Sequence, residues 1–307
     1  ATGRSLDLLP ELTRHELETR DARFTALIAD IYAQAGQAPY AINTINRRMR
    51  HDLTTSEQTL LLNARAATHA TTGEHQRALE DLTAAYEIAP QDATTRHNLG
   101  LALLSQGRSA DALPHLQAAV ELGVTDPQAR LDLAEAAYHA GDQAAALEHA
   151  KAAAPALEGD ARYRALLIHA QTAQAQWEYL ESITSLEELL TVTPNDAHLL
   201  TMAGTAYYQT AQYARAAERL EAAHNITGDP IVQEALVNAY LASQRYGDAE
   251  RALRATLATH PDDADALHKL GWALLHLGNH QGAKTAWTDA TALHHPQAAT
   301  DLKTVFQ

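Results

Sequence analysis

Hydrophobic and small residues return every three to four positions between Asp92 and Asp126, which is the spacing of one face of an α-helix. The pattern predicts two helices, one from Ala93 to about Gln106 and one from about Ser109 to Leu122. Gly107 separates them, because glycine adopts the left-handed conformation at a helix C-terminus without steric cost. The stretch therefore predicts a helical hairpin.

The same hairpin pattern repeats along nearly the whole chain. Aspartate can cap a helix N-terminus with a gain of about 1 kcal/mol, and it recurs at intervals of 33 to 36 residues. These aspartates are Asp92, Asp126, Asp160, Asp196, Asp229 and Asp263. In the second helix an alanine returns where two antiparallel backbones would approach closely, as Ala112, Ala146, Ala216, Ala249 and Ala283. In the first helix a residue pair returns, as Leu99-Gly100, Leu133-Ala134, Ala203-Gly204, Leu236-Val237 and Leu270-Gly271.

This period and these residues resemble the tetratricopeptide repeat, a helix–turn–helix of 34 residues. The resemblance implies an all-α fold, a right-handed superhelical solenoid of antiparallel helix pairs. Eight repeats are expected, at 22–58, 59–92, 93–126, 127–160, 161–196, 197–229, 230–263 and 264–297. Residues 1–21 are expected to form a helical extension that either caps or tethers the solenoid. Residues 298–307 should form a short helix that caps its other end.

Two irregularities in succession predict a joint at residues 154–161. Pro155 disfavours the helical conformation of the residue before it, so the preceding helix should end near Ala154. The next repeat lacks the turn glycine and carries Ala175-Gln176-Trp177 instead.

Composition narrows the functional classes. With 38 acidic and 23 basic side chains, the chain has a formal charge of −15, which argues against nucleic acid as a partner. The one basic cluster, Arg47-Arg48-Met49-Arg50, is interpreted as cations placed at a helix C-terminus. No apolar run is long enough to span a membrane, so we expect a soluble protein. The absence of cysteine and the start at Ala1 favour slightly a processed extracytoplasmic, periplasmic protein over a cytoplasmic one, and the sequence leaves the compartment and the oligomeric state open.

The resemblance also implies a concave groove lined by the inner face of the first helix of each repeat. Candidate groove residues are His97, Leu101, Leu104, Glu135, Tyr138, His139, His169, Thr205, Tyr208, Gln209, Asn238, His268, Trp272 and His276. Aromatic anchors in a concave site favour a protein or peptide partner, and Trp272 is the sharpest single candidate. Any one of these residues could instead cover the inner face or contact the next repeat.

The sequence also bears on two other classes of function, metal or small-ligand binding and catalysis. The 17 histidines make a metal- or small-ligand-binding solenoid the alternative to a scaffold or adaptor, although tight metal sites need three or four converging ligands. No catalytic motif or phosphate-binding glycine loop is present, so we expect no enzyme, no cofactor and no catalytic or metal residue. A chaperone-tail clamp is disfavoured, because the inner-face positions that would hold it carry no lysine.

Overall fold

The computed structural model describes residues 6–306, and all regular structure in this range is helical. The predicted all-α solenoid of helix pairs is confirmed. The chain divides into two compact units, Ala1–Thr172 and Ala173–Gln307, which are described separately as unit 1 and unit 2. Residues 1–5 of the predicted extension and residue 307 of the predicted cap lie outside the described residues.

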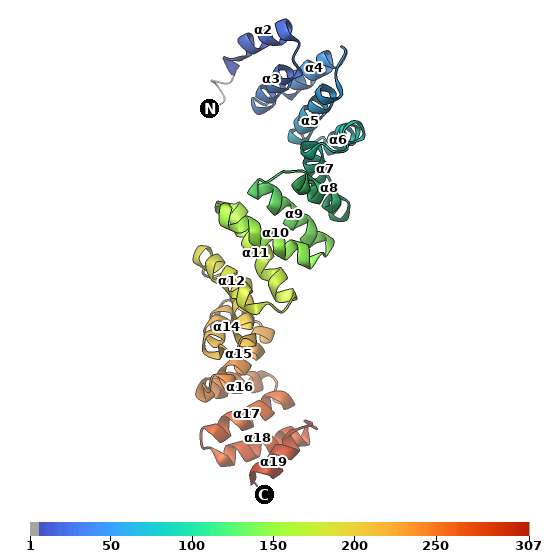
Figure 1. Ribbon diagram of the computed structural model, residues 1–307. Coiled ribbons are helices and arrows are strands. Elements are labelled where there is room, and N and C mark those ends of the chain that lie inside the picture. The colour runs from blue at the N-terminus through green and yellow to red at the C-terminus, as the bar shows by residue number, and fades with distance from the viewer. Residues whose placement is uncertain (1–5, 307) are drawn as a thin grey trace. The chain divides into compact units, whose positions relative to one another are not determined.

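Unit 1 is a series of helix pairs, α3 with α4, α5 with α6, α7 with α8 and α9 with α10, preceded by α2 (Figure 1). Its elements are α2 (Leu9–Thr19), α3 (Ala22–Gln34), α4 (Ala38–Arg48), α5 (Thr55–Thr71), α6 (His75–Ile88), α7 (Ala93–Ser105), α8 (Ser109–Glu121), α9 (Pro127–Ala140), α10 (Gln143–Ala153), the 3-10 turn η1 (Ala154–Ala156) and most of α11 (Gly159–Ala175).

Unit 2 continues the same architecture, with α12 packed on α13 and then the pairs α13 with α14, α15 with α16 and α17 with α18, closed by α19. Its helices are α12 (Tyr179–Val192), α13 (Ala197–Gln209), α14 (Tyr213–Thr227), α15 (Pro230–Ala242), α16 (Tyr246–Thr259), α17 (Ala264–His276), α18 (His280–Ala292) and α19 (Ala298–Phe306).

Most of the recurring aspartates cap the N-terminus of a helix. Five of the six aspartates are N-caps whose carboxylates accept hydrogen bonds from backbone N–H groups of the following helix: Asp92, Asp126, Asp196, Asp229 and Asp263. Asp160 differs, because α11 begins at Gly159 and therefore places this residue inside its first turn. The caps set where each repeat begins.

Small residues set how closely paired helices approach. All five recurring alanines of the second helices are fully buried. A Cβ added at Gly100 would lie 2.5 Å from Cγ of Leu116, and one added at Gly204 would lie 2.5 Å from Cγ of Leu220. Glycine at these positions thus lets a bulky residue of the second helix lie directly against the first helix.

The buried residues form a core that runs from one helix pair to the next. In unit 1 one cluster joins Leu82 of α6, Leu99 of α7, Leu116 of α8 and Leu133 of α9. Because each pair covers the apolar face of its neighbour, no pair holds a core of its own.

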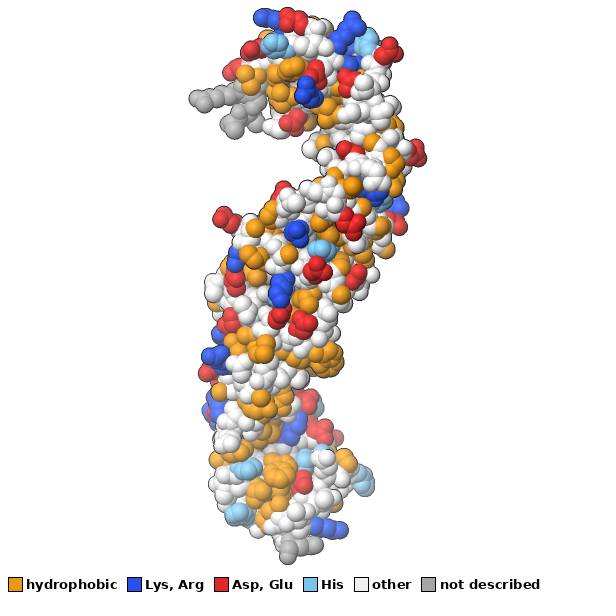
Figure 2. Space-filling model, viewed as in Figure 1, with side chains coloured by type: hydrophobic (Ala, Val, Ile, Leu, Met, Phe, Trp, Pro, Cys, Tyr) orange, Lys and Arg blue, Asp and Glu red, His pale blue; other side chains and the backbone are white. Residues whose placement is uncertain are grey.

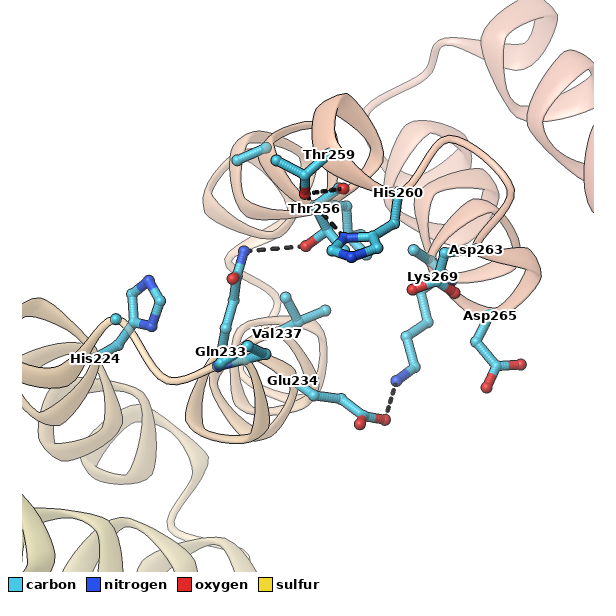
Figure 3. A pocket seen from close by; sticks show the side chains of 15 residues that line it. His224, Gln233, Glu234, Val237, Thr256, Thr259, His260, Asp263, Asp265 and Lys269 are labelled. Carbon is cyan, nitrogen blue, oxygen red and sulfur yellow. Dashed lines mark hydrogen bonds and ion pairs between the residues drawn. The ribbon is translucent and has the colours of Figure 1, made fainter.

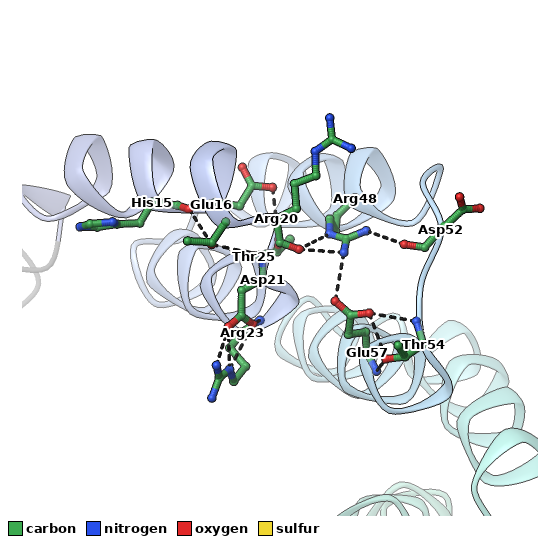
Figure 4. Close-up of polar contacts among 11 residues, drawn as sticks. His15, Glu16, Arg20, Asp21, Arg23, Thr25, Arg48, Asp52, Thr54 and Glu57 are labelled. Atoms are coloured by element: carbon green, nitrogen blue, oxygen red, sulfur yellow. Dashed lines mark hydrogen bonds and ion pairs between the residues drawn. The ribbon is translucent and has the colours of Figure 1, made fainter.

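The basic cluster at the end of α4 fixes α2 to the first helix pair (Figure 4). The guanidinium of the buried Arg48 donates to the carbonyl oxygen of Arg20 at 2.8 Å and to Glu57 at 3.0 Å. Arg47 forms an ion pair with the buried Glu16 at 3.0 Å, and the Thr25 hydroxyl also donates to Glu16. Two of the arginines predicted as helix-end cations therefore tie neighbouring elements together.

The region around Pro155 has the predicted irregularities. The helix α10 ends at Ala153 and continues as the 3-10 turn η1. Trp177, in the turn without glycine, adopts a left-handed φ of 65° and is 77% exposed. The division between the two units falls within α11, at residues 172–173, and the joint at 154–161 stays a prediction.

Candidate functional site

In unit 1 the predicted inner-face residues connect successive repeats. His97 of α7 is half-buried, and its Nε2 lies 2.9 Å from Oδ2 of Asp132 on α9. Glu135, also on α9, is half-buried and forms an ion pair with Arg164 of α11 at 2.5 Å. Burial raises the pKa of the Glu135 carboxyl, and the nearby arginine opposes that shift. These polar side chains therefore have partners within unit 1.

The other predicted residues of unit 1 differ in exposure. Leu101 and Leu104 are half-buried, and Leu104 packs against the core. Tyr138 is half-buried in edge-to-face contact with the exposed His139, at a centroid distance of 5.4 Å. His169 is buried. Tyr138 and His139 are the pair of rings that remains accessible here.

In the first part of unit 2 the predicted residues are more open. Thr205 is half-buried, and its hydroxyl donates to the carbonyl oxygen of Thr201. Tyr208 is half-buried and contacts the ring of Tyr213 at 5.3 Å, while Gln209 beside it is exposed. Asn238 on α15 is half-buried.

His268 is buried within unit 2. Its Nε2 lies 2.7 Å from Oδ2 of Asp301 on α19, and its ring stacks on that of His295 at 4.1 Å. His295 in turn lies 3.0 Å from Asp265. This imidazole therefore joins α17 to the terminal helix.

Three rings form a continuous surface at the end of α17. The rings of His276 and Tyr246 stack almost parallel, at a centroid distance of 4.3 Å and an interplanar angle of 4°. Trp272, one turn before His276, lies 6.1 Å from it and is half-buried. We call Tyr246, Trp272 and His276 the ring surface. Figure 2 shows hydrophobic and histidine side chains gathered on the visible face of this part of unit 2.

The ring surface rests on a buried tryptophan. Trp287 of α18 is fully buried, contacts Trp272 edge-to-face at 5.3 Å, and donates from Nε1 to the carbonyl oxygen of His268 at 3.0 Å. Phe306 of α19 contacts its other side at 6.0 Å. The indole of Trp287 is thus part of the core, whereas the half-buried Trp272 lies between it and solvent.

A cavity of about 670 Å³ lies nearby between α15, α16 and the start of α17 (Figure 3). Its floor includes the buried Val237 and Leu253. Gln233 spans it, donating from Nε2 to Oγ1 of Thr256 at 3.0 Å. No member of the ring surface lines this cavity.

Comparison with known proteins decides the family. Two models of the tetratricopeptide repeat match the chain, one at residues 97–161 and 234–300 and the other at 56–123. The chain belongs to the tetratricopeptide repeat family. Family membership supports a general role as a protein-interaction scaffold, and the fold is typically non-enzymatic.

Solved structures of other tetratricopeptide repeat proteins resemble this one. YrrB, described as a tetratricopeptide repeat protein with an unusual peptide-binding site, aligns with a TM-score of 0.51 at 18% identity, covering 61% of this chain and 92% of YrrB. A tetratricopeptide repeat protein from Parabacteroides merdae aligns with a TM-score of 0.48 at 16% identity, covering 92% of this chain and 97% of the other. No curated protein matches the sequence significantly. At these identities the likeness concerns the fold.

Metal-ligand clusters and membrane-spanning helices are both absent from the part of this tetratricopeptide repeat chain that the structure describes. Among residues 6–306, no three histidine, aspartate or glutamate side chains lie where they could hold one metal ion. Over the same residues, no helix is both long and apolar enough to cross a bilayer.

Two features of the candidate site are not among the residues predicted from the sequence, namely Tyr246 and the cavity. Tyr246 is the first residue of α16, and its stacking on His276 depends on how α16 meets α17. The cavity was also missed, although Val237 signalled it by standing where other repeats carry glycine or alanine.

Proposed function

We propose that this scaffold binds a helix or an extended peptide of a partner protein on the ring surface. The observation that carries the proposal is the half-buried Trp272, which is supported from below by Trp287 and extended sideways by His276 and Tyr246. Aromatic side chains held rigidly in this way supply a large apolar contact area with little loss of side-chain entropy. YrrB, whose fold is similar, is described as having a peptide-binding site, and the proposal extends peptide binding to this chain.

The accessible rings Tyr138 with His139 in unit 1, and Tyr208 with Tyr213 in unit 2, are proposed as secondary contacts of the same kind. The half-buried Leu101, Leu104, Thr205 and Asn238 and the exposed Gln209 would add polar and apolar contacts. Four residues are proposed to support the inner face of their own unit from within, because they are buried or paired with another helix: His97, Glu135 and His169 in unit 1 and His268 in unit 2.

The chain offers a matched pair of variants to test this proposal. A peptide is first selected against the full chain from a displayed library, and its affinity is then measured for Trp272→Ala and for Trp177→Ala. Truncating a central aromatic anchor should weaken binding by about 2 kcal/mol or more. Truncating the exposed Trp177, in the turn between α11 and α12, should have little effect.

Both variants are also compared in thermal unfolding. Because Trp272 is half-buried, its truncation should cost less than the roughly 3–5 kcal/mol of a fully buried tryptophan. Equal affinity of wild type and Trp272→Ala for every selected peptide would overturn the proposal. So would a variant that loses binding only because it unfolds.

A further inference from the structure

The cavity between α15, α16 and the start of α17 is lined at Val237, where the repeat pattern departs from a small residue. At the corresponding positions of three other repeats, Gly100, Gly204 and Gly271, an added Cβ would lie within 2.5 Å of a side chain of the second helix. Val237 occupies this position in the 230–263 repeat, opposite Leu253. Two branched side chains need more room than a glycine and one branched side chain, which accounts for α15 and α16 packing together less extensively than the other two helix pairs of unit 2.

The size and shape of this space suit a ligand. Its volume of about 670 Å³ falls within the range of roughly 300–1,000 Å³ that is typical of ligand pockets. The floor is apolar, with Val237 3% and Leu253 2% exposed. Such a floor accommodates an aliphatic chain rather than a bare ion.

The walls carry more negative than positive charge. Three carboxylates line the cavity, those of Glu234, Asp263 and Asp265, and the last of these also lies 3.0 Å from His295. Lys269 is the one lysine or arginine among the described lining residues. Oε1 of Glu234 accepts from Nζ of Lys269 at 3.0 Å, and Asp263 also caps α17 (Figure 3). In a protein of net charge −15 these groups attract a cation.

We propose that this cavity receives the side chain of an arginine or lysine from a partner segment. The aliphatic stem would lie on Val237 and Leu253, and the cationic head would reach Glu234 and Asp263. Long basic side chains bury their stems and keep their heads at polar groups in this way. The proposal goes beyond peptide binding on the ring surface, whose three residues do not line the cavity.

The probe for this site is Nα-acetyl-arginine amide, with Nα-acetyl-citrulline amide as its uncharged counterpart. Each is titrated into the isotopically labelled full chain, and backbone amide shifts are followed by NMR. The arginine derivative should shift resonances between residues 230 and 269. The citrulline derivative should bind about tenfold more weakly, because it lacks the charge that the carboxylates attract.

Two variants and one control keep the outcome clear. Glu234→Gln should weaken binding of the arginine derivative about threefold or more, whereas Glu218→Gln, an exposed carboxylate on α14 outside the cavity, should not. Thr256→Trp should fill the space and abolish the shifts while leaving the melting temperature close to that of wild type. Equal binding of the two derivatives, unchanged binding by Glu234→Gln, or shifts confined to other helices would each overturn the proposal. Because no selected peptide is used, these results are independent of the ring surface.

Discussion

The contact between Gly271 and Trp287 offers the sharpest test of how repeats pack. A Cβ added at Gly271 would lie 2.2 Å from Nε1 of Trp287, 2.4 Å from Cδ1 and 2.7 Å from Cε2. The indole is fully buried, and its N–H donates to the carbonyl oxygen of His268 at 3.0 Å. A flexible leucine end could move aside, but this rigid ring is enclosed by Trp272 and Phe306.

The expected magnitude for Gly271→Ala follows from opposing terms. Replacing glycine by alanine inside a helix stabilises it by about 1 kcal/mol. Overpacking costs about 1–3 kcal/mol, and an indole N–H pushed away from its acceptor costs about 1–3 kcal/mol more. The net loss in the free energy of unfolding should therefore lie between about 1 and 5 kcal/mol, centred on about 3 kcal/mol. The matched control is Gly247→Ala in α16, where an added Cβ meets nothing within 4 Å, so this variant should be neutral or slightly stabilised.

The assay must resolve the C-terminal repeat, because a solenoid need not unfold in one step. Hydrogen exchange of α17 and α18 is measured together with thermal unfolding for both glycine variants. Gly271→Ala is also combined with Trp287→Leu, which recreates the pairing of Ala66 with Leu82 in an earlier repeat. The two substitutions should then cost less together than the sum of the single changes. If Gly271→Ala proved as stable as wild type, the close-approach argument would be refuted.

Three further outcomes follow from the structure. Asp81 is buried and accepts two hydrogen bonds from the guanidinium of Arg65, so Asp81→Ala should lower the free energy of unfolding by about 3 kcal/mol. Asp111→Ala, at an exposed ion pair, should lower it by less than about 1 kcal/mol, and urea unfolding measures both changes. Burial lowers the pKa of His115 and His149 below the ordinary 6.5, so the unfolded chain binds more protons and stability should fall as the pH drops below about 6.5. Changing both histidines to glutamine should flatten this dependence, and an unchanged urea midpoint between about pH 7.5 and 5.5 in the wild type would contradict it. Limited proteolysis should cut first within 154–161, and resistance there while other turns are cut would exclude a joint.

The sequence by itself determined the fold, because the signals for a helical hairpin are local. Aspartate caps, alanines in the second helices and a period near 34 residues each act within one repeat or between adjacent helices. The helices predicted from Ala93 and from Ser109 begin at those residues in the structure. The sequence also predicts that α10 ends just before Pro155, because proline restricts the conformation of the residue that precedes it.

Only the tertiary structure decided which of the predicted inner-face residues are buried or paired and which are accessible. The sequence predicts His97 and His268 as groove residues, yet the imidazole of each contacts a carboxylate 33 to 35 residues further along the chain. That contact depends on how one repeat stacks on the next, and a repeat pattern gives the period of the stack but not the distance between two side chains. The cavity beside Val237 has the same origin. The sequence shows a valine at position 237 in place of a small residue. Whether this larger side chain separates two helices or fits among its neighbours depends on the packing around it.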